Sequence, residues 1–96
     1  MNERELLQAV REAASFTGWR SYHTHDSRHS EPGFPDLVLV RSPQIIFAEL
    51  KSAAGRVTPA QQEWLGALAA CSQVDVRVWR PDSWDAIVAD LKRVRV

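Results

Sequence analysis

Two carboxylates and an amine lie at short spacing in an otherwise apolar stretch of the sequence. Twelve residues separate Asp36 from Glu49, and Lys51 follows two residues later. Two neighbouring carboxylates repel each other unless one is protonated or a cation lies between them. A hard divalent cation such as Mg²⁺ or Mn²⁺ relieves the repulsion and also binds water and phosphate oxygens. This pattern indicates metal-dependent phosphodiester hydrolysis, with Lys51 accepting a proton or stabilising developing charge.

A β-hairpin would bring the two carboxylates together. The segments 36–40 and 45–51 are apolar and flank a short turn, which is typical of antiparallel strands. With the turn centred on residues 42–43, Asp36 lies directly opposite Glu49, with Cβ atoms about 5 Å apart. A register shifted by one residue would separate the pair. In the alternative interpretation, Glu49 and Lys51 are ordinary charges at strand ends and Asp36 caps a turn.

The rest of the sequence supplies elements that can flank this hairpin. Apolar residues recur at helical spacing in three segments, and two further segments alternate as strands do. Both hairpin strands are apolar on both sides, so we expect helices to cover both faces of the sheet. The fold class is α/β, a small mixed β-sheet flanked by helices, in one domain of residues 1–96. The expected order is α-β-β-β-α-β-α, with helices at 2–17, 58–71 and 84–91 and strands at 19–25, 36–40, 45–51 and 74–78.

The composition excludes several classes of protein. Of the 96 residues, 45% are hydrophobic and 25% are charged, which is ordinary for a globular domain. No apolar run approaches the ~20 residues of a membrane-spanning helix, and no leader pattern suggests export. Cys71 is the only cysteine, so we expect no intrachain disulfide and a cytoplasmic protein. Twelve basic and twelve acidic residues cancel, so the chain is not a generally basic nucleic-acid binder.

Several short motifs occur in an order that resembles one nuclease family. Pro35-Asp36, followed after twelve residues by Glu49-Leu50-Lys51, is similar to the signature of the PD-(D/E)xK nuclease superfamily. The flanking segments narrow the resemblance to the VRR-NUC family, and together they cover nearly the whole chain. These segments are 18–19, 22–24, 33–40, 48–52, 58–61 leading to Trp64, and 78–81.

The resemblance implies a restriction-endonuclease-like core and a metal-dependent endonuclease that acts on DNA. Asp36 and Glu49 would bind Mg²⁺ or Mn²⁺, helped by the backbone carbonyl of Leu50, and Lys51 would be the catalytic lysine. No organic cofactor is implied. The family also uses a glutamate from the first helix, for which Glu3 and Glu5 compete.

Helical periodicity favours Glu3 as that glutamate. It lies three, four and seven residues before Leu6, Leu7 and Val10, so it extends the apolar stripe that faces the core. A carboxylate near a helix N-terminus is also favourable without any role in a site.

The family's helix glutamine corresponds to Gln61, for which two roles remain open. It could orient Lys51 or a phosphate, or it could close a capping box with Thr58. One side chain does not easily do both.

A histidine-rich segment and several arginines are candidates for contacts with DNA. The family's Tyr-His-Thr segment places His23 near the metal and the DNA, and Arg20, Arg41 and Arg80 could track phosphates without reading sequence. Alternatively, His23, His25 and His29 could hold zinc. The selected candidates for DNA binding are His23, Arg28, Ser30 and Arg56.

Stand-alone members of the family resemble junction-cleaving enzymes that act as homodimers. The resemblance therefore implies a homodimer that cuts branched or four-way-junction DNA. The alternatives are a non-catalytic DNA-binding module on the same fold, and an interaction domain that zinc stabilises through the histidine cluster.

Overall fold

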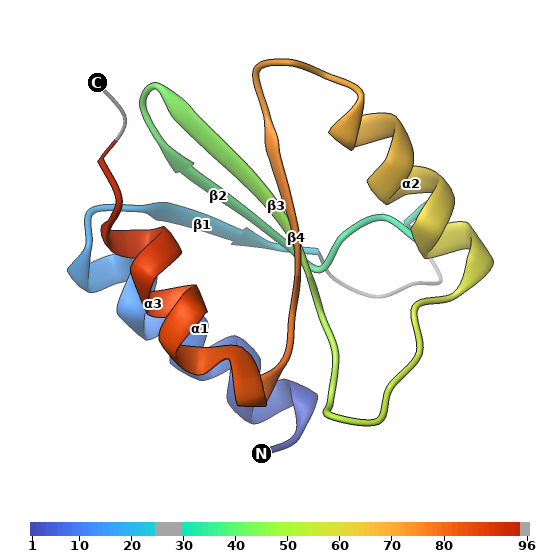
Figure 1. Cartoon of the computed structure of the whole chain (residues 1–96), viewed down its shortest axis with the longest axis horizontal. Coiled ribbons are helices and arrows are strands. Elements are labelled where there is room, and N and C mark those ends of the chain that lie inside the picture. Colours follow the sequence, from blue (N-terminus) through green and yellow to red (C-terminus); the bar gives the residue numbers. More distant parts are fainter. Residues whose placement is uncertain (25–29, 95–96) are drawn as a thin grey trace.

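The computed structural model describes residues 1–24 and 30–94 (Figure 1). The elements follow the predicted order, with one short 3-10 helix added before the last α-helix. None of the described helices is long and apolar enough to cross a membrane. The elements are α1 (Glu3–Phe16), β1 (Arg20–His23), β2 (Leu37–Arg41), β3 (Gln44–Leu50), α2 (Pro59–Ala69), β4 (Asp75–Trp79), η1 (Pro81–Ser83) and α3 (Trp84–Lys92).

Helices α1 and α2 both begin at capping boxes that the sequence encodes. The Asn2 side chain accepts the backbone N–H of Glu5, and the Glu5 side chain accepts the backbone N–H of Asn2. Thr58 and Gln61 form the same reciprocal pair at α2, with Pro59 at the first helical position. These bonds satisfy donors that a helix N-terminus leaves open. They therefore fix the first turn of each helix, from which each contributes a candidate site residue.

The four strands form one mixed sheet in the order β1-β2-β3-β4. The first three are antiparallel neighbours, and β4 runs parallel to β3. In the hairpin, Leu37 faces Ala48 and Val38 faces Phe47, which confirms the predicted register. Asp36 directly precedes β2, so this register carries it to the position opposite Glu49.

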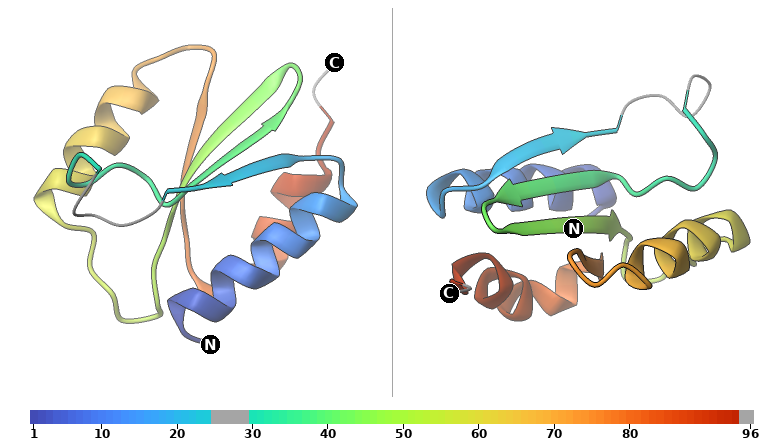
Figure 2. Two further views of the ribbon diagram at one scale, coloured as in Figure 1. Left: turned by 180° about the vertical axis from the view of Figure 1, so that it is seen from behind. Right: turned by 90° about the horizontal axis from the view of Figure 1, so that it is seen from above.

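The hydrophobic core lies between one face of the sheet and the helices α1 and α3. These two helices contact each other, and α2 lies apart from both of them (Figures 1 and 2). Burying such side chains supplies most of the favourable free energy of folding. The core consists of Leu6, Val10, Ala14, Trp19, Leu37, Leu39, Ile46, Ala48, Leu50, Trp79, Ile87 and Leu91.

The opposite face of the sheet is covered by α2 over only part of its area, so the prediction that helices cover both faces is confirmed only in part. Helix α2 has no buried residue. Its Trp64 packs edge-on against Phe34, which in turn packs edge-on against Phe47 of β3. The helix thus lies over one part of this face, where it contacts β4 and where Gln61 reaches Glu49 of β3, and it leaves the rest of the face open. Exposed apolar side chains on this open face are Tyr22, Val40 and Val78.

Candidate active site

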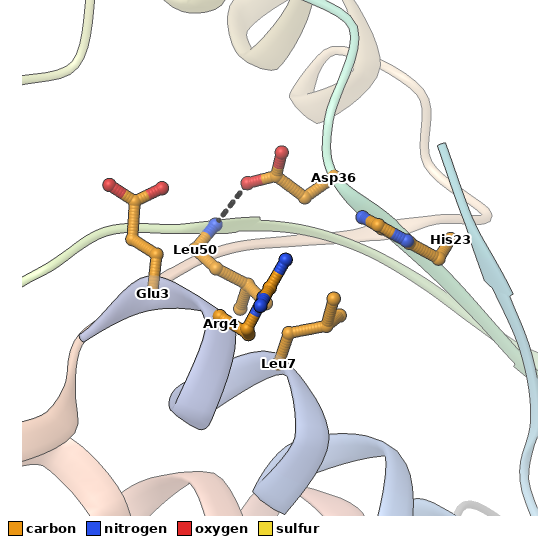
Figure 3. A pocket seen from close by; sticks show the side chains of 6 residues that line it. All are labelled: Glu3, Arg4, Leu7, His23, Asp36 and Leu50. Carbon is orange, nitrogen blue, oxygen red and sulfur yellow. Dashed lines mark hydrogen bonds between the residues drawn. The ribbon is translucent and has the colours of Figure 1, made fainter. Parts of the chain in front are cut away.

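Asp36 is held at the end of β2 by hydrogen bonds from two neighbouring segments. Thr24 donates its backbone N–H to the Asp36 carbonyl and its hydroxyl to the Pro35 carbonyl, both at 2.9 Å. The Asp36 carboxylate accepts the backbone N–H of Leu50 through Oδ2 at 2.9 Å (Figure 3). This side-chain bond extends the hairpin by one step and fixes the carboxylate beside β3.

Glu49 is a buried carboxylate with one oxygen partnered and one oxygen unpartnered. The residue is 1% exposed. Its Oε2 accepts the side-chain amide of Gln61 at 2.9 Å and lies 3.7 Å from Lys51 Nζ. Its Oε1 is buried and has no hydrogen-bond partner among the described residues. A buried carboxylate oxygen without a partner is costly, so this atom marks a place where a ligand would be stabilising.

The surroundings of Glu49 oppose its ionisation. Burial first, and then the negative charge of Asp36 and a hydrogen bond between the two carboxyl side chains, raise the pKa of Glu49 to about 8, whereas Lys51 opposes that rise. A neighbouring carboxylate and a low-dielectric site both disfavour a second negative charge. The two acids therefore form a strained pair that a cation would relieve, as the sequence indicates.

Gln61 closes the capping box with Thr58 and at the same time reaches into the candidate site, where its partner is Glu49 and not the predicted Lys51. Its Oε1 accepts the backbone N–H of Thr58 at 2.9 Å and closes the capping box, while its Nε2 donates to Glu49. An amide has an acceptor at one end and donors at the other, which the prediction overlooked. Gln61 therefore orients the side chain of Glu49.

The loop before Asp36 approaches α2 closely, and only glycine fits at the point of contact. Gly33 has a φ of +88°, and a Cβ on it would meet the Ala60 carbonyl group and lie 2.8 Å from the backbone nitrogen of Gln61. Glycine alone adopts this backbone region without strain. Neither Gly33 nor Thr24 receives a role from the sequence. The positive φ and the close approach depend on tertiary structure, although the segment Pro32-Gly33-Phe34-Pro35 is typical of a turn.

A cavity of about 230 Å³ opens beside Asp36. Glu3 at the start of α1 lies on it, whereas Glu5 is engaged in the capping box. The exposed Glu3 carboxylate points toward the same space as Asp36 (Figure 3). The structure therefore brings Glu3 and Asp36 to one cavity. The side chains that line it are Glu3, Arg4, Leu7, His23, Asp36 and Leu50.

The described residues include no group of three His, Cys, Asp or Glu side chains placed to hold a metal ion. Glu3 therefore shares the cavity with Asp36 but does not complete a three-carboxylate cluster with Glu49. Of the proposed zinc ligands, His23 lies on the cavity, and His25 and His29 lie outside the described residues.

Two of the arginines considered for DNA contacts have structural partners instead. Arg41 stacks on Trp19 at 4.4 Å and donates to the backbone carbonyls of Thr17, Leu91 and Arg93. Arg80 donates to the carbonyls of Ser52 and Gly55, both at 2.7 Å, and so holds the loop that follows Lys51.

The other DNA-contact candidates fall in different settings. Arg20 and Arg56 are exposed, and Ser30 is half-buried at the start of the loop before β2. Arg28 lies outside the described residues. The structure thus gathers His23, but not Arg56 or Ser30, on the cavity beside Asp36.

Comparison with known proteins places the chain in a family. The model of the VRR-NUC domain family matches residues 1–82. This chain belongs to the VRR-NUC family. Membership indicates a nuclease-type function with DNA as the substrate.

A solved structure titled "VRR_NUC domain protein" has the same fold, with a TM-score of 0.68 and 18% identity. The alignment covers 96% of this chain and 86% of that one. No curated protein matches the sequence.

Proposed function

We propose that this VRR-NUC protein is a Mg²⁺- or Mn²⁺-dependent endonuclease that hydrolyses phosphodiester bonds in DNA. The observation that carries the proposal is the buried, unpartnered Oε1 of Glu49 next to Asp36. Without a cation, Glu49 must stay protonated beside Asp36, whereas a bound cation would allow both groups to ionise. They suit a hard divalent ion, which binds carboxylates together with water and phosphate oxygens.

The donor set fits such an ion. Asp36, Glu49 and the carbonyl of Leu50 supply oxygen ligands only, as Mg²⁺ and Mn²⁺ prefer. When bound, the metal would lower the pKa of a water molecule and polarise the phosphate. Glu3 lies on the same cavity and would reach it from α1.

Lys51 is the group we assign to proton transfer or charge stabilisation. It is 8% exposed and its Nζ lies 3.7 Å from Glu49 Oε2. The partial burial strengthens its field at the reacting phosphate, because a low-dielectric environment screens charge less than water does. Gln61 acts as a positioning residue, since its hydrogen bond keeps Glu49 Oε2 turned toward α2 and leaves Oε1 for the ion.

The direct test is incubation of the purified protein with plasmid, linear and four-way-junction DNA in Mg²⁺, in Mn²⁺ and with a chelator. We expect cleavage in both metals and none with the chelator. Binding without cleavage in Mn²⁺ would reject the proposal and leave a non-catalytic DNA-binding module on this fold. Cleavage that persists with the chelator would reject the metal.

We also propose that the protein acts as a homodimer on branched DNA. A chain of 96 residues has little surface with which to hold a duplex, and two copies would present two sites to two strands. The open face of the sheet leaves Tyr22 62%, Val40 41% and Val78 40% exposed, and a second copy would cover them. A standard interface buries about 800 Å² per partner.

Sedimentation tests the dimer, alone and with junction DNA. We expect a dimer that Tyr22→Glu dissociates, and preferential cutting of junctions over linear duplex. A protein that sediments only as a monomer on DNA would refute this assembly.

A further inference from the structure

A second hollow lies on the exposed side of α1, next to the candidate active site. It has a volume of about 600 Å³ and is lined by Arg4, Leu7, Gln8, Arg11 and Glu12. Arg4 and Leu7 also line the cavity beside Asp36. The two hollows are therefore adjacent on the surface of α1. We call the second hollow the α1 trough.

Helical geometry explains why polar side chains line this trough. Arg4, Gln8 and Arg11 have the spacing i, i+4 and i+7, which places them on one side of a helix. The opposite stripe of α1 is buried in the core. The polar row is thus held at a fixed orientation by the packing of the apolar one.

The two arginines present cationic groups at the two ends of this row. The Arg4 side chain points toward the space between Asp36 and His23 (Figure 3). Arg11 Nε donates to Ser21 Oγ of β1 at 3.1 Å. That bond uses one of the five N–H donors of a guanidinium, so Arg11 is oriented while retaining donors for an anionic ligand.

We propose that the α1 trough binds the sugar-phosphate backbone of the DNA strand that enters the active site. This inference rests on the proposed function and adds how that substrate is held. Arg4 contacts a phosphate adjacent to the reacting one, and Arg11 contacts a phosphate farther along. A rise of 1.5 Å per residue separates the two by about 10 Å along the helix. At 3.4 Å per nucleotide of one strand, this spans about three nucleotides.

Glu12 provides a residue of opposite charge in the trough, so the role of charge in DNA binding can be tested. It lines the same hollow one residue beyond Arg11 and opposes a phosphate there. If backbone phosphates occupy the trough, removing the arginines weakens binding and removing the Glu12 charge strengthens it. A trough with a merely structural role would not give opposite signs.

The experiment measures binding of fluorescently labelled duplex and junction DNA by anisotropy in Ca²⁺, across a salt series. The variants are Arg4→Gln, Arg11→Gln and Glu12→Gln. Arg93→Gln is the matched control, since the Arg93 side chain is 61% exposed and pairs with Asp90 at the far end of the chain. Thermal melting of each variant confirms that it is folded.

We expect each of Arg4→Gln and Arg11→Gln to weaken binding by roughly 3- to 10-fold and to reduce the salt slope by about 0.9. Glu12→Gln should tighten binding about 2- to 3-fold, and Arg93→Gln should leave it unchanged. In cleavage assays, Arg11→Gln should raise KM more than it lowers kcat.

The outcomes separate this inference from the proposed function. If the parent chain binds DNA but does not cut it in either metal, the endonuclease proposal fails and the anisotropy series still decides the trough. If the two arginine variants bind as Arg93→Gln does, or if the parent chain binds no DNA, the trough proposal is overturned.

Discussion

Alternate residues of β3 face two very different environments. Ile46, Ala48 and Leu50 point into the core under α1 and α3, where each is at most 2% exposed. Phe47 and Glu49 point to the other face, where a buried carboxylate lies between a loop and α2. One strand thus contributes to the core on one side and to the candidate active site on the other. Packing of the apolar side fixes the backbone of β3, and this offsets the cost of burying the Glu49 carboxyl on the polar side.

The largest predicted effect is the loss of cleavage activity when residues of the candidate site are replaced. Glu49→Gln, Asp36→Asn and Lys51→Ala should each reduce cleavage by at least about 10³-fold, while circular dichroism shows the fold intact. Glu63→Gln, on the exposed surface of α2, is the matched control and should retain full activity. A Lys51→Ala protein that cleaves normally would contradict its assigned role.

Substitutions on the apolar side of the sheet should lower the free energy of unfolding. Leu39→Ala removes a fully buried side chain and should lower the free energy of unfolding by about 2–5 kcal/mol, because it loses burial and leaves a cavity. Val40→Ala, one residue along on the open face, should cost about 1 kcal/mol or less. Chemical denaturation of both variants measures the contrast. Equal losses at a protein concentration that keeps the chain monomeric would contradict an open face.

Gly33 should affect both stability and activity, because the loop that it shapes carries Asp36 and contacts the start of α2. Gly33→Ala would strain a positive φ and force a clash with the Ala60 carbonyl group. We expect a loss of about 1–3 kcal/mol in the free energy of unfolding and a lower kcat. Gly66→Ala on α2 is the control, since a Cβ there meets nothing within 4 Å, and it should be neutral or slightly stabilising. A fully active, fully stable Gly33→Ala protein would rule out the tight contact.

The sequence predicts the elements, the strand order of the hairpin and its register, because these depend on local periodicity and turn length. It also selects Glu3 over Glu5, and the capping box shows why Glu5 is engaged elsewhere. It does not predict that α2 covers only part of its face of the sheet, since the Phe34 side chain that packs between Trp64 and Phe47 comes from a loop without periodicity. Nor does it foresee that Arg41 and Arg80 bind backbone carbonyls, which only the assembled chain brings within reach.

The raised pKa of Glu49 makes the stability of the metal-free protein depend on pH. The pKa of Glu49 is raised from 4.5 to about 8 in the folded chain, by burial first and by Asp36 second. Between these values the folded state binds more protons than the unfolded state, so the free energy of unfolding falls as pH rises. We expect a metal-free loss of about 1–3 kcal/mol from pH 5 to pH 8.5, relative to Glu49→Gln, which lacks this titration. Calorimetry of both proteins in chelator measures the difference.

Added Mg²⁺ should oppose this loss, because an ion that binds only the folded, ionised pair stabilises it in proportion to its occupancy. The rise in Tm with Mg²⁺ should therefore be larger at pH 8.5 than at pH 5, and it should disappear in Glu49→Gln. This readout does not depend on cleavage, so it tests the acidic pair as a cation site separately from the nuclease reaction. An equal rise in Tm in the parent chain and in Glu49→Gln would place the cation elsewhere on the molecule.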